Sequence, residues 1–360
     1  MIIRTTTEDA YFAASNSSKG FFSYYTECFD HARIGHIYAI KGGPGTGKSR
    51  FMREVAAAGV AEGWSCESVY CSSDPDSLDG VILSRGDRAI ALLDATAPHV
   101  YEPSRPGARE DLVNLGIFWD SERLTAQAAE IGALQARKSE AYRRAYRYLA
   151  ALGEMREAGD SLVRPYIKRD AIRAFAERLI ADVGMGGGYE EQIALMCSVG
   201  MQGAVGFDTY FRRAKEIFLI KDCRGSGQYL MADLYALADE RGQAIRVSHD
   251  PIMPDRIDAI LFRESQRLFA LCRAENCQYP FKLIDMRRFV DTASMREVRR
   301  EANFTGRMQR AMLEGAIDAL GCVREAHFAL EAIYSAAMNF EAKETFTKIF
   351  CRELFDLQNR

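Results

Sequence analysis

The sequence contains the same order of local patterns twice, and this repetition limits the fold more than any other feature. Residues 37–41 and 217–221 are short apolar runs that predict buried strands. Each run is followed by a glycine-containing turn and a helical pattern, over about 48–62 in the first copy and about 229–241 in the second. A strand, a turn and a helix that occur twice predict two related α/β units.

The correspondence continues beyond the two helices. Residues 74–82 match residues 253–261, and the strand-like run 88–93 matches 267–272. Residues that persist in both copies are interpreted as structural. Among them, Pro75 is expected in the first turn of a helix, where a missing backbone N–H costs nothing.

Each copy ends in a long helical pattern of mixed charged and apolar residues, over about 118–182 and about 292–358. The glycine-rich stretch 184–188 between the copies is typical of a flexible joint. We therefore predict two halves, 1–183 and 184–360, each with a helical appendage. Apolar side chains at helical spacing in these appendages leave two further roles open, contact with a protein partner and self-association into a homo-oligomer.

The turn of the first half has the pattern Gly-x-x-x-x-Gly-Lys-Ser between a strand and a helix, which is typical of phosphate-binding loops. Glycines let the backbone curl until several N–H groups converge on phosphate oxygens, and the helix start adds unpaired donors. Lys48 is expected at the β- and γ-phosphates, and the Ser49 hydroxyl at a bound Mg²⁺. The predicted nucleotide contacts are Gly42, Gly43, Pro44, Gly45, Thr46, Gly47, Lys48, Ser49 and Arg50. The predicted fold is a duplicated P-loop NTPase of the α/β class, with a mostly parallel sheet flanked by helices.

Mg²⁺ at such a loop usually needs a carboxylate from a second strand. Asp94 ends an apolar run and is the first candidate for this role. Asp74 is a second candidate metal ligand, because its counterpart in the second half is Met253. Lys19 is a candidate nucleotide contact for a similar reason, since Val205 stands at the matched position.

The second half has lost the residues that would contact phosphate or metal. The matched pairs are Gly42 and Asp222, Lys48 and Gln228, Ser49 and Tyr229, and Asp94 and Arg273. We infer one working site and one remnant. The alternative is that the second half binds a different ligand, with Arg224 and Arg273 as the groups to test.

The stretch after Asp94 leaves the end of a strand, where the ligand crevice of open α/β sheets lies. His99 and Glu102 are therefore candidate catalytic residues that orient water, accept a proton or touch the metal. Arg105 and Arg109 follow in a loop that either closes over the phosphates or is an ordinary solvated loop.

The 360 residues have a net charge of −3 and no long block of like charge, so nucleic acid is an unlikely partner. The start of the chain does not match a signal peptide, and no apolar run is long enough to span a membrane. The nine cysteines include no Cys-x-x-Cys pair, so we expect reduced, mostly buried thiols in a cytoplasmic protein rather than a zinc site.

These motifs resemble those of a bacterial family of P-loop ATPase-like proteins with two tandem nucleotide-binding-like halves. The resemblance rests on Lys19-Gly20-Phe21 and on the stretches 41–49, 71–80 and 94–99. It implies ATP binding. It also implies a phosphate loop in each half, and this chain departs from that in the second half.

Together the residues lead us to expect an MgATP-binding protein, with ATP hydrolysis used as a switch or an energy source. A small-molecule or nucleotide kinase is the alternative, and it is favoured by Ala95 because a hydrolase often carries Glu directly after the metal-binding Asp. A non-catalytic nucleotide sensor is a third reading. A GTPase is disfavoured, because the chain has no Asn-Lys-x-Asp motif.

Overall fold

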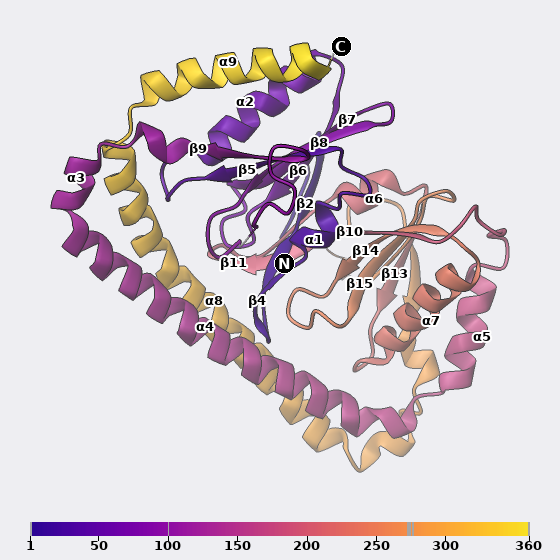
Figure 1. Cartoon of the computed structure of the whole chain (residues 1–360). Helices are drawn as coiled ribbons and strands as arrows, with labels where there is room; N and C mark the ends of the chain where they lie inside the picture. The colour runs from indigo at the N-terminus through magenta and orange to yellow at the C-terminus, as the bar shows by residue number, and fades with distance from the viewer. Residues whose placement is uncertain (1, 100, 272–274, 276, 359–360) are drawn as a thin grey trace.

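The computed structural model describes residues 2–99, 101–271, 275 and 277–358, which form two six-stranded sheets joined by long helices (Figure 1). The first sheet is mixed, and β7 runs opposite to both of its neighbours. The other neighbouring strands are parallel. In spatial order the strands are β2 (Asp9–Phe12), β6 (Ser65–Tyr70), β7 (Leu78–Arg85), β8 (Arg88–Asp94), β5 (His36–Lys41) and β9 (Glu110–Asn114).

The second sheet has the same arrangement, with β15 antiparallel to both of its neighbours and the other neighbours parallel. Its strands in spatial order are β10 (Glu190–Ile193), β14 (Ala244–His249), β15 (Ile257–Phe262), β16 (Arg267–Ala270), β13 (Glu216–Lys221) and β17 (Lys282–Asp285). The short apolar runs form buried strands as predicted, and β13 places Phe218 and Ile220 in one core and Ile217 and Leu219 in another.

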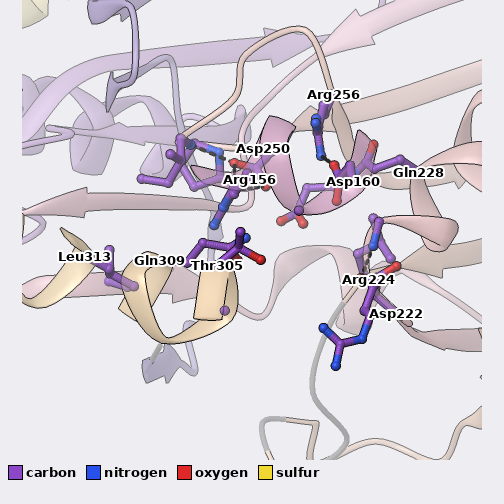
Figure 2. Close-up of a pocket in the computed structure, with 18 of the residues that line it drawn as sticks. Arg156, Asp160, Asp222, Arg224, Gln228, Asp250, Arg256, Thr305, Gln309 and Leu313 are labelled. Carbon is purple, nitrogen blue, oxygen red and sulfur yellow. Dashed lines mark hydrogen bonds and ion pairs between the residues drawn. The ribbon is translucent and has the colours of Figure 1, made fainter. Parts of the chain in front are cut away.

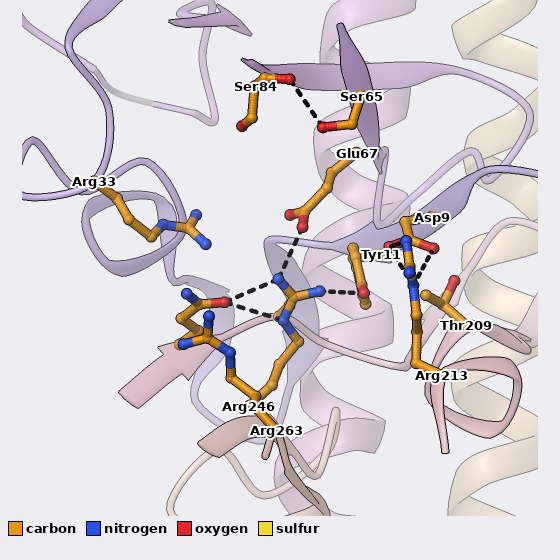
Figure 3. A network of polar contacts seen from close by, with 12 residues as sticks. Asp9, Tyr11, Arg33, Ser65, Glu67, Ser84, Thr209, Arg213, Arg246 and Arg263 are labelled. Carbon is orange, nitrogen blue, oxygen red and sulfur yellow. Dashed lines mark hydrogen bonds and ion pairs between the residues drawn. The ribbon is translucent and has the colours of Figure 1, made fainter. Parts of the chain in front are cut away.

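The two sheets meet at the edges that carry β2 and β10, and short elements join them. The backbones of Phe12 and Leu195 exchange hydrogen bonds of 2.9 and 2.8 Å. A partly buried polar network lies alongside, in which Arg246 of β14 donates to Glu67 of β6 at 2.8 Å and Arg213 pairs with Asp9 (Figure 3). The short elements are β1 (Ile2–Arg4), β3 (Ala14–Ser17), β4 (Gly20–Ser23), α1 (Tyr25–Cys28), β11 (Cys197–Gly200), β12 (Gly203–Phe207) and α6 (Thr209–Arg213).

The helical appendages dominate the outline of the molecule, and α4 and α8 lie side by side in opposite directions (Figure 1). Arg137 pairs with Glu325 near one end of this helix pair, and Gly159 packs on Thr305 near the other. The helices are α3 (Ser121–Ala126), α4 (Ala128–Val163), α5 (Arg169–Leu179), α8 (Arg299–Ala336) and α9 (Phe340–Gln358), with single 3₁₀ turns at Leu115–Phe118, Arg164–Tyr166, Met286–Phe289 and Ser294–Arg296.

Each appendage ends on the sheet of the other half. Helix α5 buries Ile172 and Ala176 in the core of the second sheet, whereas α9 buries Leu354 and Phe355 in the core of the first. Figure 1 shows α9 along α2 (Lys48–Ala61) and α5 beside α7 (Ser226–Glu240). A backbone hydrogen bond joins the two halves where each appendage passes from one to the other. The Lys168 N–H donates to the Phe289 carbonyl, and the Asn339 N–H donates to the Phe118 carbonyl.

Three local expectations need correction. The second helix begins at Ser226 rather than near residue 229, since the loop before it is shorter than in the first half. Pro75 lies in a turn that leads into β7 and not in a helix. The glycine-rich stretch 184–188 is tied to the turn after α7, because the N–H of Gly186 donates to the carbonyl of Arg241 at 2.8 Å.

Candidate phosphate-binding site

Residues 42–47 join the end of β5 to the first turn of α2. Gly45 and Gly47 have φ values of +69° and +76°, in the left-handed region that glycine enters without strain. The Thr46 hydroxyl donates to the carbonyl oxygen of Gly43 at 2.9 Å and closes the turn. The glycines therefore stand where the curl of the loop requires them.

Lys48 folds back across this loop. Its ammonium donates to the carbonyl oxygens of Gly42 at 2.8 Å and of Gly43 at 2.9 Å. It also lies 3.5 Å from a carboxylate oxygen of Asp94, and both side chains are mostly buried. Because an ammonium has three N–H groups, two hold the loop and one remains for an anion or a carboxylate.

Asp94 is fixed at the end of β8 beside the loop. Its carboxylate accepts a hydrogen bond from the backbone N–H of Thr96 at 2.8 Å, and the Thr96 hydroxyl donates to the carbonyl of Gly42 at 2.9 Å. Burial raises the pKa of the Asp94 carboxyl, and the nearby Lys48 ammonium opposes this rise. A cation placed here would therefore relieve the cost of keeping the carboxylate charged.

Ser49 lies at the start of α2 and faces the beginning of β7. Its hydroxyl oxygen accepts a hydrogen bond from the backbone N–H of Leu78 at 2.9 Å. A hydroxyl has two lone pairs, so one remains free for a metal ion. The structure thus places Lys48 against Asp94, and Ser49 next to Lys48 at the start of α2 with its hydroxyl at the beginning of β7.

The remaining predicted residues divide between the site and its surroundings. His99 is buried and pairs with Asp79 at 3.0 Å, while Glu102 is exposed and pairs with Lys41 at 3.1 Å. Burial lowers the pKa of His99, but the Asp79 carboxylate raises it, and the net direction is upward. Arg50 points along the exposed face of α2 to Glu54 and Glu344.

Two candidates contact the opposite half of the chain. Lys19 pairs with Asp255 in the loop before β15, with a nitrogen–oxygen distance of 2.7 Å. The Asp74 carboxylate accepts from the Gln202 amide at 3.2 Å. The turn between β3 and β4 contacts the loop before β15, as the hydrogen bond from the Ser18 N–H to the Ile252 carbonyl shows. In the same way, the turn between β11 and β12 contacts the loop before β7.

The loop that carries Arg105 and Arg109 does not close over the phosphate-binding loop. The Arg109 guanidinium donates to the carbonyls of His31 and Ile34 at 2.8 Å each and to that of Gly35 at 3.1 Å. These carbonyls lie just before β5, at the opposite end of that strand from the loop. Of the two alternatives for this loop, closure over the phosphates through Arg109 is therefore not supported.

Sequence reasoning missed the contacts that the second appendage makes with the loop. The Ser335 hydroxyl of α8 donates to the carbonyl of Gly45 at 2.9 Å, and the Tyr334 ring packs on Gly43. The fully buried Lys343 of α9 places its ammonium beside Gly47. No local motif identifies these residues, because they lie about 290 positions away from the loop.

The matching turn of the second half is closed by its own side chain. Asp222 accepts hydrogen bonds from the N–H groups of Gly225 at 2.8 Å and Gly227 at 2.7 Å. Its carboxylate thus occupies donors that a phosphate would need. Arg224 adopts a φ of +53° and binds the Ala302 carbonyl, and Arg273 lies outside the described residues.

A cavity of about 670 Å³ lies beside this second turn (Figure 2). The ends of α4 and α8 and the loop before β15 line it. Two of its arginines are already engaged in the wall, since Arg156 pairs with Asp250 at 2.9 Å and Arg256 with Asp160 at 2.5 Å. The cavity therefore presents arginines whose charges are already paired within its wall.

Asp222→Ala is expected to lower the free energy of unfolding by about 1–2 kcal/mol, because two N–H groups at the start of α7 lose their acceptor. Urea denaturation followed by circular dichroism measures this change. Asp239→Ala, at an exposed position near the end of the same helix, should change it by less than about 0.5 kcal/mol. Equal effects of the two substitutions would contradict the capping role.

Comparison of the chain with known protein families, curated proteins and solved structures finds no match. Within the part of the chain that the structure describes, no helix is both long enough and apolar enough to cross a membrane.

Proposed function

We propose that the first half binds MgATP at the loop 42–49 and hydrolyses it slowly. The observation that carries this proposal is the position of Lys48, which is held by two loop carbonyls and faces Asp94. In this proposal the loop N–H groups and Lys48 bind the phosphates. Ser49 and Asp94 hold Mg²⁺, which would neutralise charge on the transferring phosphoryl group.

The proposed hydrolysis is slow because the candidate residues that follow Asp94 are not free to activate water. His99 is already paired with Asp79, and Glu102 points to solvent beside Lys41. The buried Ala95 directly after Asp94 cannot polarise water. Slow turnover suits a switch, and the contact between Ser335 of α8 and Gly45 gives the nucleotide a direct mechanical link to the long helices.

We also propose that the two halves are related copies of a P-loop unit, of which one keeps a working phosphate site. The support is the shared strand order of the two sheets, together with Gly47 and Gly225, which each adopt a left-handed conformation directly before the helix that follows the turn. In this view the second site was lost, and the Asp222 carboxylate now accepts the backbone hydrogen bonds that a phosphate would otherwise accept.

MgATP is expected to raise the melting temperature of the wild-type protein, whereas Lys48→Ala should show no rise. At 100 times its dissociation constant a ligand adds about 2.7 kcal/mol, which corresponds to roughly 5–11 °C in domains of this size. Thermal scans with MgATP and MgGTP measure the shift. Gln228→Ala, at the matched position of the second half, is the control and should keep the full response. A wild-type protein that does not respond would refute nucleotide binding.

A kinase that uses the same bound ATP is the second candidate, and Ala95 after Asp94 favours it. The discriminating measurement is phosphate release without an added acceptor. Steady release that is lost in Lys48→Ala supports a hydrolase, and tight binding without release supports a kinase or a sensor.

A further inference from the structure

Three potential metal ligands from three separate segments meet beside Asp94. Cys71 follows β6, Asp79 lies in β7 and His99 follows β8. Their sulfur, carboxylate oxygen and ring nitrogen atoms all lie within 4.8 Å of one another. Nothing in the spacing along the sequence links Cys71 to Asp79 or His99.

The cluster is sheltered from water and its histidine is incompletely satisfied. Asp79 and His99 are each about 5% exposed, and the Tyr25 ring stacks on His99 at a centroid distance of 4.7 Å. Nδ1 of His99 is buried and has no hydrogen-bond partner among the described residues. Nε2 of His99 and a carboxylate oxygen of Asp79 face each other at 3.0 Å, so both point into the same small space as the Cys71 sulfur.

We propose that Cys71, Asp79 and His99 bind a divalent transition-metal ion of the Zn²⁺ class. Zn²⁺ accepts sulfur, nitrogen and oxygen together, at about 2.0–2.3 Å, so tetrahedral ligands lie roughly 3–4 Å apart. The observed cluster needs only small side-chain movements to reach that spacing. Mg²⁺ takes oxygen ligands in octahedral geometry and does not fit this set.

Binding exchanges protons for the metal without any redox change. The Cys71 thiol releases its proton to solvent, and Asp79 binds as a carboxylate. The proton that Nε2 of His99 shares with Asp79 must leave that pair, so that the ring keeps its single proton on Nδ1 and binds through the lone pair of Nε2. Three protein ligands leave the fourth position for water or a substrate atom, which is the pattern of reactive rather than structural zinc sites.

The second half provides an internal control. Its matched positions carry Asp250, Asp258 and Gln278, with neither a thiol nor an imidazole. Asp250 is tied to Arg156, and Gln278 is exposed. The proposed metal site is therefore confined to the half that keeps the phosphate-binding loop, but it does not depend on nucleotide binding.

Cobalt(II) titration of the full-length protein, stripped with a chelator beforehand, tests the proposal. We expect one Co²⁺ per chain, a sulfur-to-cobalt charge-transfer band in the near ultraviolet and displacement of the band by Zn²⁺. Cys71→Ser should abolish the band, and His99→Gln should weaken Co²⁺ binding at least about 100-fold. Circular dichroism and melting temperatures without metal show whether each variant is folded.

Two matched variants separate this site from other thiols and from the nucleotide site. Cys66→Ser should keep the band, because that thiol lies outside the cluster. Lys48→Ala should also keep it, so a failure of nucleotide binding does not affect the result. A wild-type protein that shows no thiolate band, or a band that persists in Cys71→Ser, overturns the proposal.

Discussion

Phe355→Ala is expected to lower the free energy of unfolding by about 3–5 kcal/mol and to loosen the first sheet rather than the second. Phe355 belongs to α9, at the far end of the chain, yet it is 5% exposed and buried in the core under α2 with Trp64. Removing the ring leaves a cavity against residues of the first half. Urea denaturation measures the loss, and hydrogen exchange shows which sheet opens.

Ile172→Ala in α5 is the matched variant for this test. Ile172 is fully buried on the second sheet with Leu230 and Ile245, so its loss should cost about 2–5 kcal/mol. Faster exchange is expected in α7 and β14 for Ile172→Ala, and in α2 and β7 for Phe355→Ala. The opposite pattern would mean that each appendage packs on its own half.

Gly45→Ala is expected to lower the free energy of unfolding by about 3 kcal/mol and to weaken MgATP binding. A Cβ at Gly45 would collide with the backbone carbonyl oxygen of Glu331 and lie 2.7 Å from the Ser335 hydroxyl oxygen. The φ of +69° adds a conformational cost of about 1 kcal/mol, and the collision adds about 1–3 kcal/mol. The loop and α8 must therefore move apart.

Gly63→Ala isolates the collision from the backbone cost. Gly63 has a φ of +83°, and a Cβ there would meet no atom of the structure within 4 Å. Its replacement should therefore cost only about 1 kcal/mol and leave the response to MgATP unchanged. Thermal scans of both variants, with and without MgATP, decide the matter. Equal losses in the free energy of unfolding for the two variants would show that close packing of α8 against Gly45 does not contribute to the effect.

Much of the local structure could be predicted, because local patterns carry it. The apolar run before Gly42 is β5, the helical pattern after Gly47 is α2, and the long helices lie close to the predicted ranges. Lys48 and Asp94 could be grouped in advance, because the turn after one parallel strand and the end of the neighbouring strand lie at the same edge of a sheet.

Contacts between distant segments could not be predicted in this way. The sequence placed Lys19 near the nucleotide, but its hairpin turn reaches Asp255 of the second half. Cys71, Asp79 and His99 are spaced irregularly along the chain, and only the order of β6, β7 and β8 in the sheet brings them together. These three side chains lie together because their strands are neighbours in the sheet. The periodicity of a sequence predicts where strands lie along the chain but not which strands pair.

The sequence by itself determined the kinds of elements and the glycine-rich turn between β5 and α2, because both depend on residues within a few positions of one another. Only the tertiary structure decided which sheet each appendage covers. Helix α5 packs on the second sheet and α9 on the first, and apolar residues at helical spacing do not by themselves distinguish one sheet from the other. Helices α4 and α8 carry each appendage past its own sheet. Their length and direction therefore decide which sheet α5 and α9 cover.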